Sequence, residues 1–134
     1  MAAYEELQSY TLTHGGSTFI HQHVVDAWAA QNADSNTKAI ALTFGLVGLY
    51  LRIERAYTGR QVQQVHMMLS RRSKHWPSFP LPRERGAVTA ITVMAAPPGP
   101  ERDRAIDDWC ASVWNAFRDS HPAVVELLKQ HGIN

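Results

Sequence analysis

Apolar residues recur every three to four positions along most of this chain, the spacing that places side chains on one face of an α-helix. The same spacing predicts helices over about 4–13, 18–31, 36–56, 59–71 and 100–120, and a short final helix that closes at Gly132. The most regular stripe consists of Ile106, Trp109, Cys110, Val113 and Phe117. The pattern therefore predicts an all-α protein.

Residues that favour helix starts stand where these stripes begin. A capping side chain accepts a hydrogen bond from a free backbone N–H group in the first turn. Pro100 suits the first position of the last long helix, where no N–H bond is lost. We expect the caps at Ser17 or Thr18, at Ser35 or Asn36, and at Thr58.

Residues 72–88 interrupt the helical pattern with three prolines and a glycine. Each proline disfavours helix at the residue before it, so this segment is predicted to be a long irregular loop. We expect Trp76, Phe79 and Leu81 to pack back onto the helices. The next segment, 89–96, fits a strand or a helix; we favour a short helix capped by Thr89, because no second strand is predicted to pair with it.

The most apolar segment runs from Ala39 to Leu51. It spans 13 residues, whereas a membrane-spanning helix needs about 20. We therefore expect no membrane span and a helix buried on all sides, in which Gly45 and Gly48 let a neighbouring helix approach closely. The length of 134 residues fits one domain, residues 1–134. The expected fold is a bundle of four main helices with additional short helices and the proline-rich loop.

The lone cysteine, Cys110, cannot form an internal disulfide and lies on an apolar stripe, so we expect a buried, unreactive thiol. The absence of an apolar leader at the N-terminus also favours a cytoplasmic protein. Eight basic and two acidic residues lie between Arg52 and Arg85, a local net charge of +6 in a chain whose total is +1. Such a surface suits an anionic partner such as nucleic acid. For the basic 71–85 segment, the alternative is a solvated face whose arginines pair with Asp103, Asp107 and Asp108.

Histidines on two predicted helices carry the candidate chemistry. His66 follows Val62 by four positions and so points inward with the apolar stripe. Imidazole and carboxylate groups on facing helices of a bundle can bind a divalent transition metal such as zinc. The candidate ligands are His21, His23, Asp26 and His66. The alternative is that His66 is a core histidine bonded to a carbonyl group or to Asp26.

Three segments resemble those of a family of small, uncharacterised bacterial helical proteins. Residues 21–31 match its H-x-x-x-V-D-A-[YW]-x-x-Q pattern, residues 85–89 match R-G-x-x-T, and residues 109–117 match W-x-x-x-V-W-x-A-[WF]. The resemblance implies no activity, because none is assigned to the family. Two departures concern metal binding: Asn32-Ala33 replaces a frequent His-Pro, and a cysteine pair near the N-terminus is missing. The positions that carry over are His21, Asp26, Gln31, Trp109 and Trp114.

These observations leave two hypotheses of different classes. The first is a small ligand-binding or metal-binding bundle, whose histidine-lined pocket lies between helices 18–31 and 59–71 under the 72–88 loop. The second is an interaction module, either a homodimer or a binder of an anionic partner, that uses the basic 71–85 segment. The sequence does not show whether the protein is an enzyme.

Overall fold

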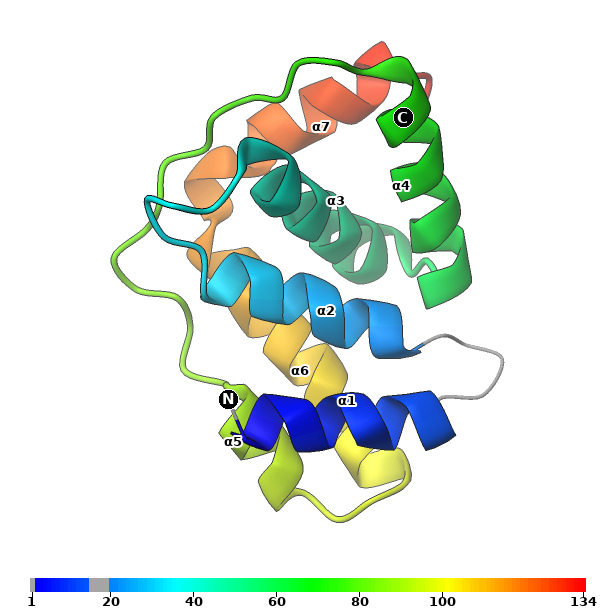
Figure 1. Cartoon of the computed structure of the whole chain (residues 1–134), viewed down its shortest axis with the longest axis vertical. Coiled ribbons are helices and arrows are strands. Elements are labelled where there is room, and N and C mark those ends of the chain that lie inside the picture. Colours follow the sequence, from blue (N-terminus) through cyan, green and yellow to red (C-terminus); the bar gives the residue numbers. More distant parts are fainter. Residues whose placement is uncertain (1, 15–19) are drawn as a thin grey trace.

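The computed structural model describes residues 2–14 and 20–134, and the predicted cap at Ser17 or Thr18 lies outside them. These residues form helices and no strands, which confirms the all-α prediction (Figure 1). In chain order the elements are α1 (Ala2–His14), α2 (Ile20–Gln31), α3 (Ala39–Arg55), α4 (Gly59–Arg72), α5 (Ala90–Ala95), α6 (Pro100–Ala116), the 3-10 turn η2 (Arg118–Ser120) and α7 (His121–Gln130).

The predicted helix starts are correct for α4, α5 and α6 and wrong for α3. Thr58 and Thr89 each accept a hydrogen bond from the backbone three residues ahead and form capping boxes. Pro100 begins α6. The residue before α3 is Lys38, whose side chain makes no cap hydrogen bond. The polar residues before it instead build a turn around Asp34, whose Oδ1 accepts from the backbone N–H of Asn36 at 2.8 Å.

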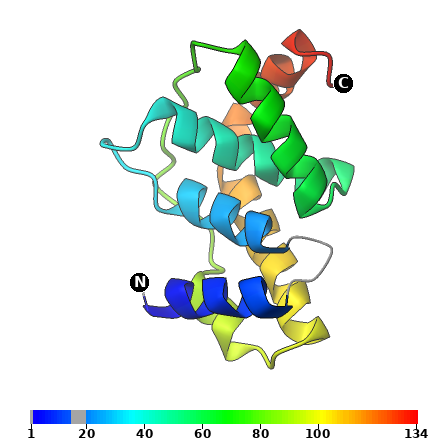
Figure 2. The same ribbon diagram turned by 45° about the vertical axis from the view of Figure 1, so that its right-hand side comes forward.

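Helix α2 lies between α1 and α3, and both views show this order (Figures 1 and 2). It packs against α3 on one side and α6 on another. The predicted stripe of α6 supplies much of the core, because Trp109 is fully buried and Phe117 is 1% exposed. Burying one such large apolar side chain stabilises the fold by about 1.5–3 kcal/mol.

Helix α3 is buried along most of its length, as its composition predicts. Gly45 explains how α2 comes so close: a methyl group there would lie 3.2 Å from the backbone oxygen of Asp26. Within the described residues, no helix combines the length and the apolar character that crossing a membrane requires.

The loop between Arg72 and Ala90 runs along one side of the molecule and joins α4 at one end to α5 at the other (Figure 1). Phe79 is buried, and the half-buried Trp76 ring meets Phe44 edge-to-face at 5.3 Å. Leu81 is 38% exposed, so it packs inward only in part.

Candidate functional site

His66 points into the core from α4, as predicted, and is 8% exposed. Its Nε2 lies 2.8 Å from the backbone oxygen of Phe44 and must donate, since a carbonyl group only accepts. The imidazole also stacks on the Phe44 ring at 4.7 Å. This is the arrangement of a core histidine bonded to a carbonyl group, which the sequence left as the alternative to a metal ligand.

Acid is expected to destabilise the protein through His66. Burial lowers its pKa to about 4, whereas an unfolded chain has a histidine pKa of about 6.5. Unfolding therefore takes up a proton as pH falls from 6.5 to 4, and each pH unit costs up to about 1.4 kcal/mol. His66→Gln, which can still donate to Phe44, should reduce the loss of stability between pH 7 and 5 in urea unfolding. Parallel pH profiles for the two proteins would contradict this assignment.

His21 and His23 lie in the first turns of α2 but face different neighbours. The Nδ1 of His21 is 3.0 Å from Oγ1 of Thr11, which ties α2 to α1. His23 is buried, and its Nδ1 has no hydrogen-bond partner in the described part of the chain. Burial, with a smaller effect of the Arg52 charge, lowers its pKa to about 4. His23 is therefore neutral near pH 7.

Asp26 is buried on the face of α2 that meets α3. Its Oδ1 accepts from Nε2 of Gln22 at 3.0 Å, whereas Oδ2 has no partner among the residues described. The carboxyl group fits against Gly48, because a Cβ there would lie 1.8 Å from Oδ2. Burial raises the pKa of Asp26 well above its ordinary value. The group is thus a buried acid that favours its protonated form.

The structure does not gather the four predicted ligands into one group. In the ranges that the structure covers, no three His, Cys, Asp or Glu side chains are grouped so that they could hold a metal ion. His66 is bonded to the Phe44 carbonyl and His21 lies against Thr11. Helical periodicity indicated correctly that His66 faces the interior, but it does not fix which side chains meet there.

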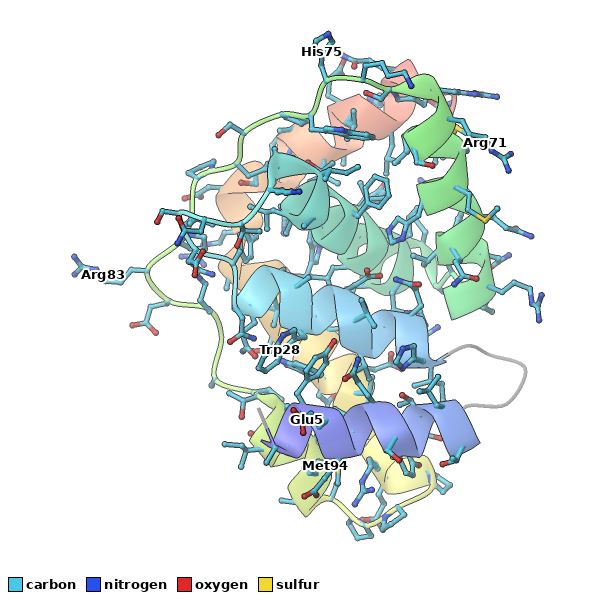
Figure 3. The ribbon with its side chains drawn as sticks, viewed as in Figure 1. Glu5, Trp28, Arg71, His75, Arg83 and Met94 are labelled. Carbon is cyan, nitrogen blue, oxygen red and sulfur yellow. The ribbon has the colours of Figure 1, made fainter. Side chains whose placement is uncertain are left out.

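The acidic face of α6 pairs with residues other than the predicted ones. Asp107 receives two hydrogen bonds of 2.8 Å from Arg52 of α3. Asp103 accepts from the Tyr10 hydroxyl of α1 at 2.9 Å. In Figure 3, Arg71 and Arg83 extend from opposite sides of the molecule, so the basic segment does not present these two charges on one surface.

A pocket of about 360 Å³ opens between α1, the end of α2, the end of the long loop and α5. This is not the place predicted from the histidines, and no histidine belongs to the lining that the described residues form. Most of the lining is apolar. It consists of Ala3, Tyr4, Trp28, Gln31, Asn32, Arg85, Gly86, Thr89, Ala90 and Ile91.

Aromatic stacking forms the wall where α1 meets α2. The rings of Tyr4 and Trp28 lie parallel, with their centres 4.2 Å apart and their planes within 5°. Tyr4 is buried and Trp28 is half-buried. Burial, followed by the nearby Asp26 carboxyl group, raises the Tyr4 pKa, so its hydroxyl stays protonated near pH 7.

The amide of Gln31 joins α2, the long loop and α6. Its Oε1 accepts from the indole N–H of Trp109 at 2.9 Å. Its Nε2 donates to the backbone oxygen of Val88 at 2.7 Å and to that of Arg85 at 3.3 Å. One polar side chain, placed by the buried Trp109, therefore fixes the loop end that borders the pocket.

Arg85 fastens the same loop end to the last turn of α2. Its Nη1 donates to the backbone oxygens of Ala30 and Gln31 at 3.2 and 3.1 Å. Its Nε donates to the backbone oxygen of Pro82 at 2.6 Å. The carbonyl groups at a helix end lack partners within the helix, and a cation there also interacts favourably with the helix dipole.

Sequence reasoning missed this pocket, although the three family-like segments meet around it. Trp28 and Gln31 come from the first segment, Arg85 and Thr89 from the second, and Trp109 from the third bonds to Gln31. The three segments are far apart along the chain, and the hydrogen bonds of the Gln31 side chain join them in the fold. The available signal was that these segments occur in the same order as in the family. Sequence order does not give the distances between the segments in the fold.

Fold and pocket together define a small helical protein with a lined recess at the junction of α1, α2 and α5. The chain belongs to the family of unknown function DUF5946, whose sequence model matches residues 1–118. This agrees with the resemblance to an uncharacterised helical family. No curated protein and no solved structure matches the chain.

Proposed function

We propose that this protein binds a small organic molecule in the pocket between α1, α2 and α5. The supporting observation is that a mostly apolar recess is walled by the same segments that carry the family resemblance. Ligand sites are typically concave and apolar with a few placed polar groups, and measure about 300–1,000 Å³. A volume of about 360 Å³ suits a compound of one or two rings.

The walls of the pocket are held before any ligand arrives, which favours binding. The Tyr4–Trp28 stack fixes one side, and the hydrogen bonds of Gln31 and Arg85 fix another. A site that is already ordered loses little conformational freedom on binding, so more of the contact energy appears as affinity.

The proposal is tested with two tryptophan substitutions at equally exposed isoleucine or leucine positions. Ile91 is 73% exposed and lines the pocket, whereas Leu12 is 70% exposed and lies outside the lining. Amide NMR spectra are recorded with benzoate, benzamide, indole, indole-3-acetate and indole-3-acetamide. We expect at least one compound to shift the signals of Ala3, Thr89 and Ile91. Ile91→Trp should lower the affinity for that compound at least tenfold, because the added ring occupies the recess.

Leu12→Trp should leave the affinity within about twofold of the unsubstituted protein. The proposal is wrong if none of the five compounds shifts the pocket signals at millimolar concentration. It is equally wrong if the shifts gather at another place, or if both tryptophan variants bind as well as the original chain.

A further inference from the structure

We infer that the ligand of this pocket is an organic anion, with a flat apolar body against the Tyr4–Trp28 wall and an acidic group at Arg85. This inference rests on the proposed function and names the chemical class of the ligand. The shared chemistry is a carboxylate or a phosphate monoester on a small ring system.

The charge of the lining points to an anion. Arg85 is the single charged side chain among the ten described residues that line the pocket. It forms no ion pair with any residue that the structure describes, in contrast to Arg52, which pairs with Asp107. Its sequence neighbour Glu84 is exposed and is not part of the wall, and the same is true of Glu5 on α1.

The arginine is oriented by the fold and retains a donor group. Its Nε and Nη1 are occupied by three backbone oxygens, while Nη2 makes no hydrogen bond within the described ranges. The guanidinium carbon also lies 5.7 Å from the centre of the Phe117 ring. Because carbonyl dipoles offset a full charge only in part, the half-buried Arg85 in this position favours an anion.

The other lining residues indicate which kind of ligand body fits the pocket. Trp28 and Tyr4 form a broad aromatic wall, and Ala3, Ala90 and Ile91 are also apolar. No acidic side chain belongs to the described lining, so a cationic ligand would meet an arginine and no counter-charge. An uncharged ligand could use the apolar wall but would leave the guanidinium without a counter-ion. An anion on a flat apolar ring would contact the aromatic wall and also neutralise the Arg85 charge.

The test compares ligands that differ in charge and little in shape, on the unaltered full chain. Affinities are measured by calorimetry for indole-3-acetate against indole-3-acetamide, and for benzoate against benzamide. We expect each carboxylate to bind at least tenfold more tightly than its amide, because a charge-assisted hydrogen bond to arginine is stronger than a neutral one. Phenyl phosphate, measured beside benzoate, shows whether the site prefers a phosphate or a carboxylate.

Two arginine variants test whether the preference for the acid over the amide depends on Arg85. Arg85→Lys keeps the positive charge but loses the donor fork, and should reduce the preference for the acid over the amide at least threefold. Arg83→Gln is the control for a basic residue outside the pocket, since Arg83 lies two residues away on the same loop, is exposed and lies outside the lining. It should leave the preference unchanged.

The outcomes separate this inference from the proposed function. Equal binding of acids and amides, with pocket signals shifted by both, keeps the binding site and overturns the anionic ligand. No binding by any compound overturns both. If Arg85→Lys perturbs the fold, the acid–amide comparison on the unaltered chain still decides the question. An acid preference lost in Arg83→Gln would place the anion elsewhere on the loop and overturn the assignment to Arg85.

Discussion

Gly48→Ala is expected to lower the free energy of unfolding by about 3 kcal/mol, the upper part of the range for overpacked cores. A Cβ at this position would lie 1.8 Å from Oδ2 and 2.4 Å from Cγ of Asp26. The whole carboxyl group would have to move within a buried interface between α2 and α3. Alanine is otherwise the better helix former by about 1 kcal/mol, so a loss of stability identifies the clash as its cause.

A double-mutant cycle checks this explanation by urea unfolding. Asp26→Ala removes the carboxyl group, so the methyl group that Gly48→Ala adds then has space. We expect Gly48→Ala to cost at least about 2 kcal/mol less in the Asp26→Ala background than in the unaltered chain. Additive effects of the two substitutions would show that Gly48 and Asp26 do not share the space that the structure gives them.

The second large effect is a loss of stability with rising pH that depends on Asp26. Burial raises the pKa of this carboxyl group in the folded chain well above 3.8. Between 3.8 and the folded pKa, the unfolded chain binds fewer protons than the native one. Raising the pH through this window therefore favours unfolding, by up to about 1.4 kcal/mol for each pH unit.

Asp26→Asn tests this with a side chain of nearly the same shape that carries no charge at any pH. The stability of the variant at pH 8, relative to its stability at pH 5, should exceed the same quantity for the unaltered chain. The difference between the two pH profiles isolates the effect of Asp26 from that of the buried histidines, whose effect on stability has the opposite pH dependence. Asp108→Asn is the control, because Asp108 is an exposed aspartate on α6. A difference profile that is flat, or no larger than that of Asp108→Asn, would contradict the raised pKa.

The helices could be predicted because their signals are local. The stripe of α6, the capping threonines before α4 and α5, and the prolines of the long loop each act within a few residues. The cap of α3 was wrong for a related reason: Asn36 and Thr37 take part in the Asp34 turn, and sequence alone does not rank a turn against a cap.

The candidate site was harder to predict because its contacts join distant positions. Periodicity placed His66 in the interior correctly, yet it did not show that His66 is bonded to the Phe44 carbonyl group. It also did not show that the Asp26 carboxyl group lies against Gly48. The pocket depends on hydrogen bonds such as Gln31 to Val88 and Trp109 to Gln31. Helical spacing carries no information about partners that lie so far apart along the chain.

The pocket walls come from Ala3 near one terminus and from Ile91 near the start of α5, with the end of α2 between them. Such a recess exists only when these remote stretches have assembled, so partly unfolded chains lack it. A compound bound there would select the complete native state and raise the melting temperature of the molecule as a whole, by an amount that grows with ligand concentration.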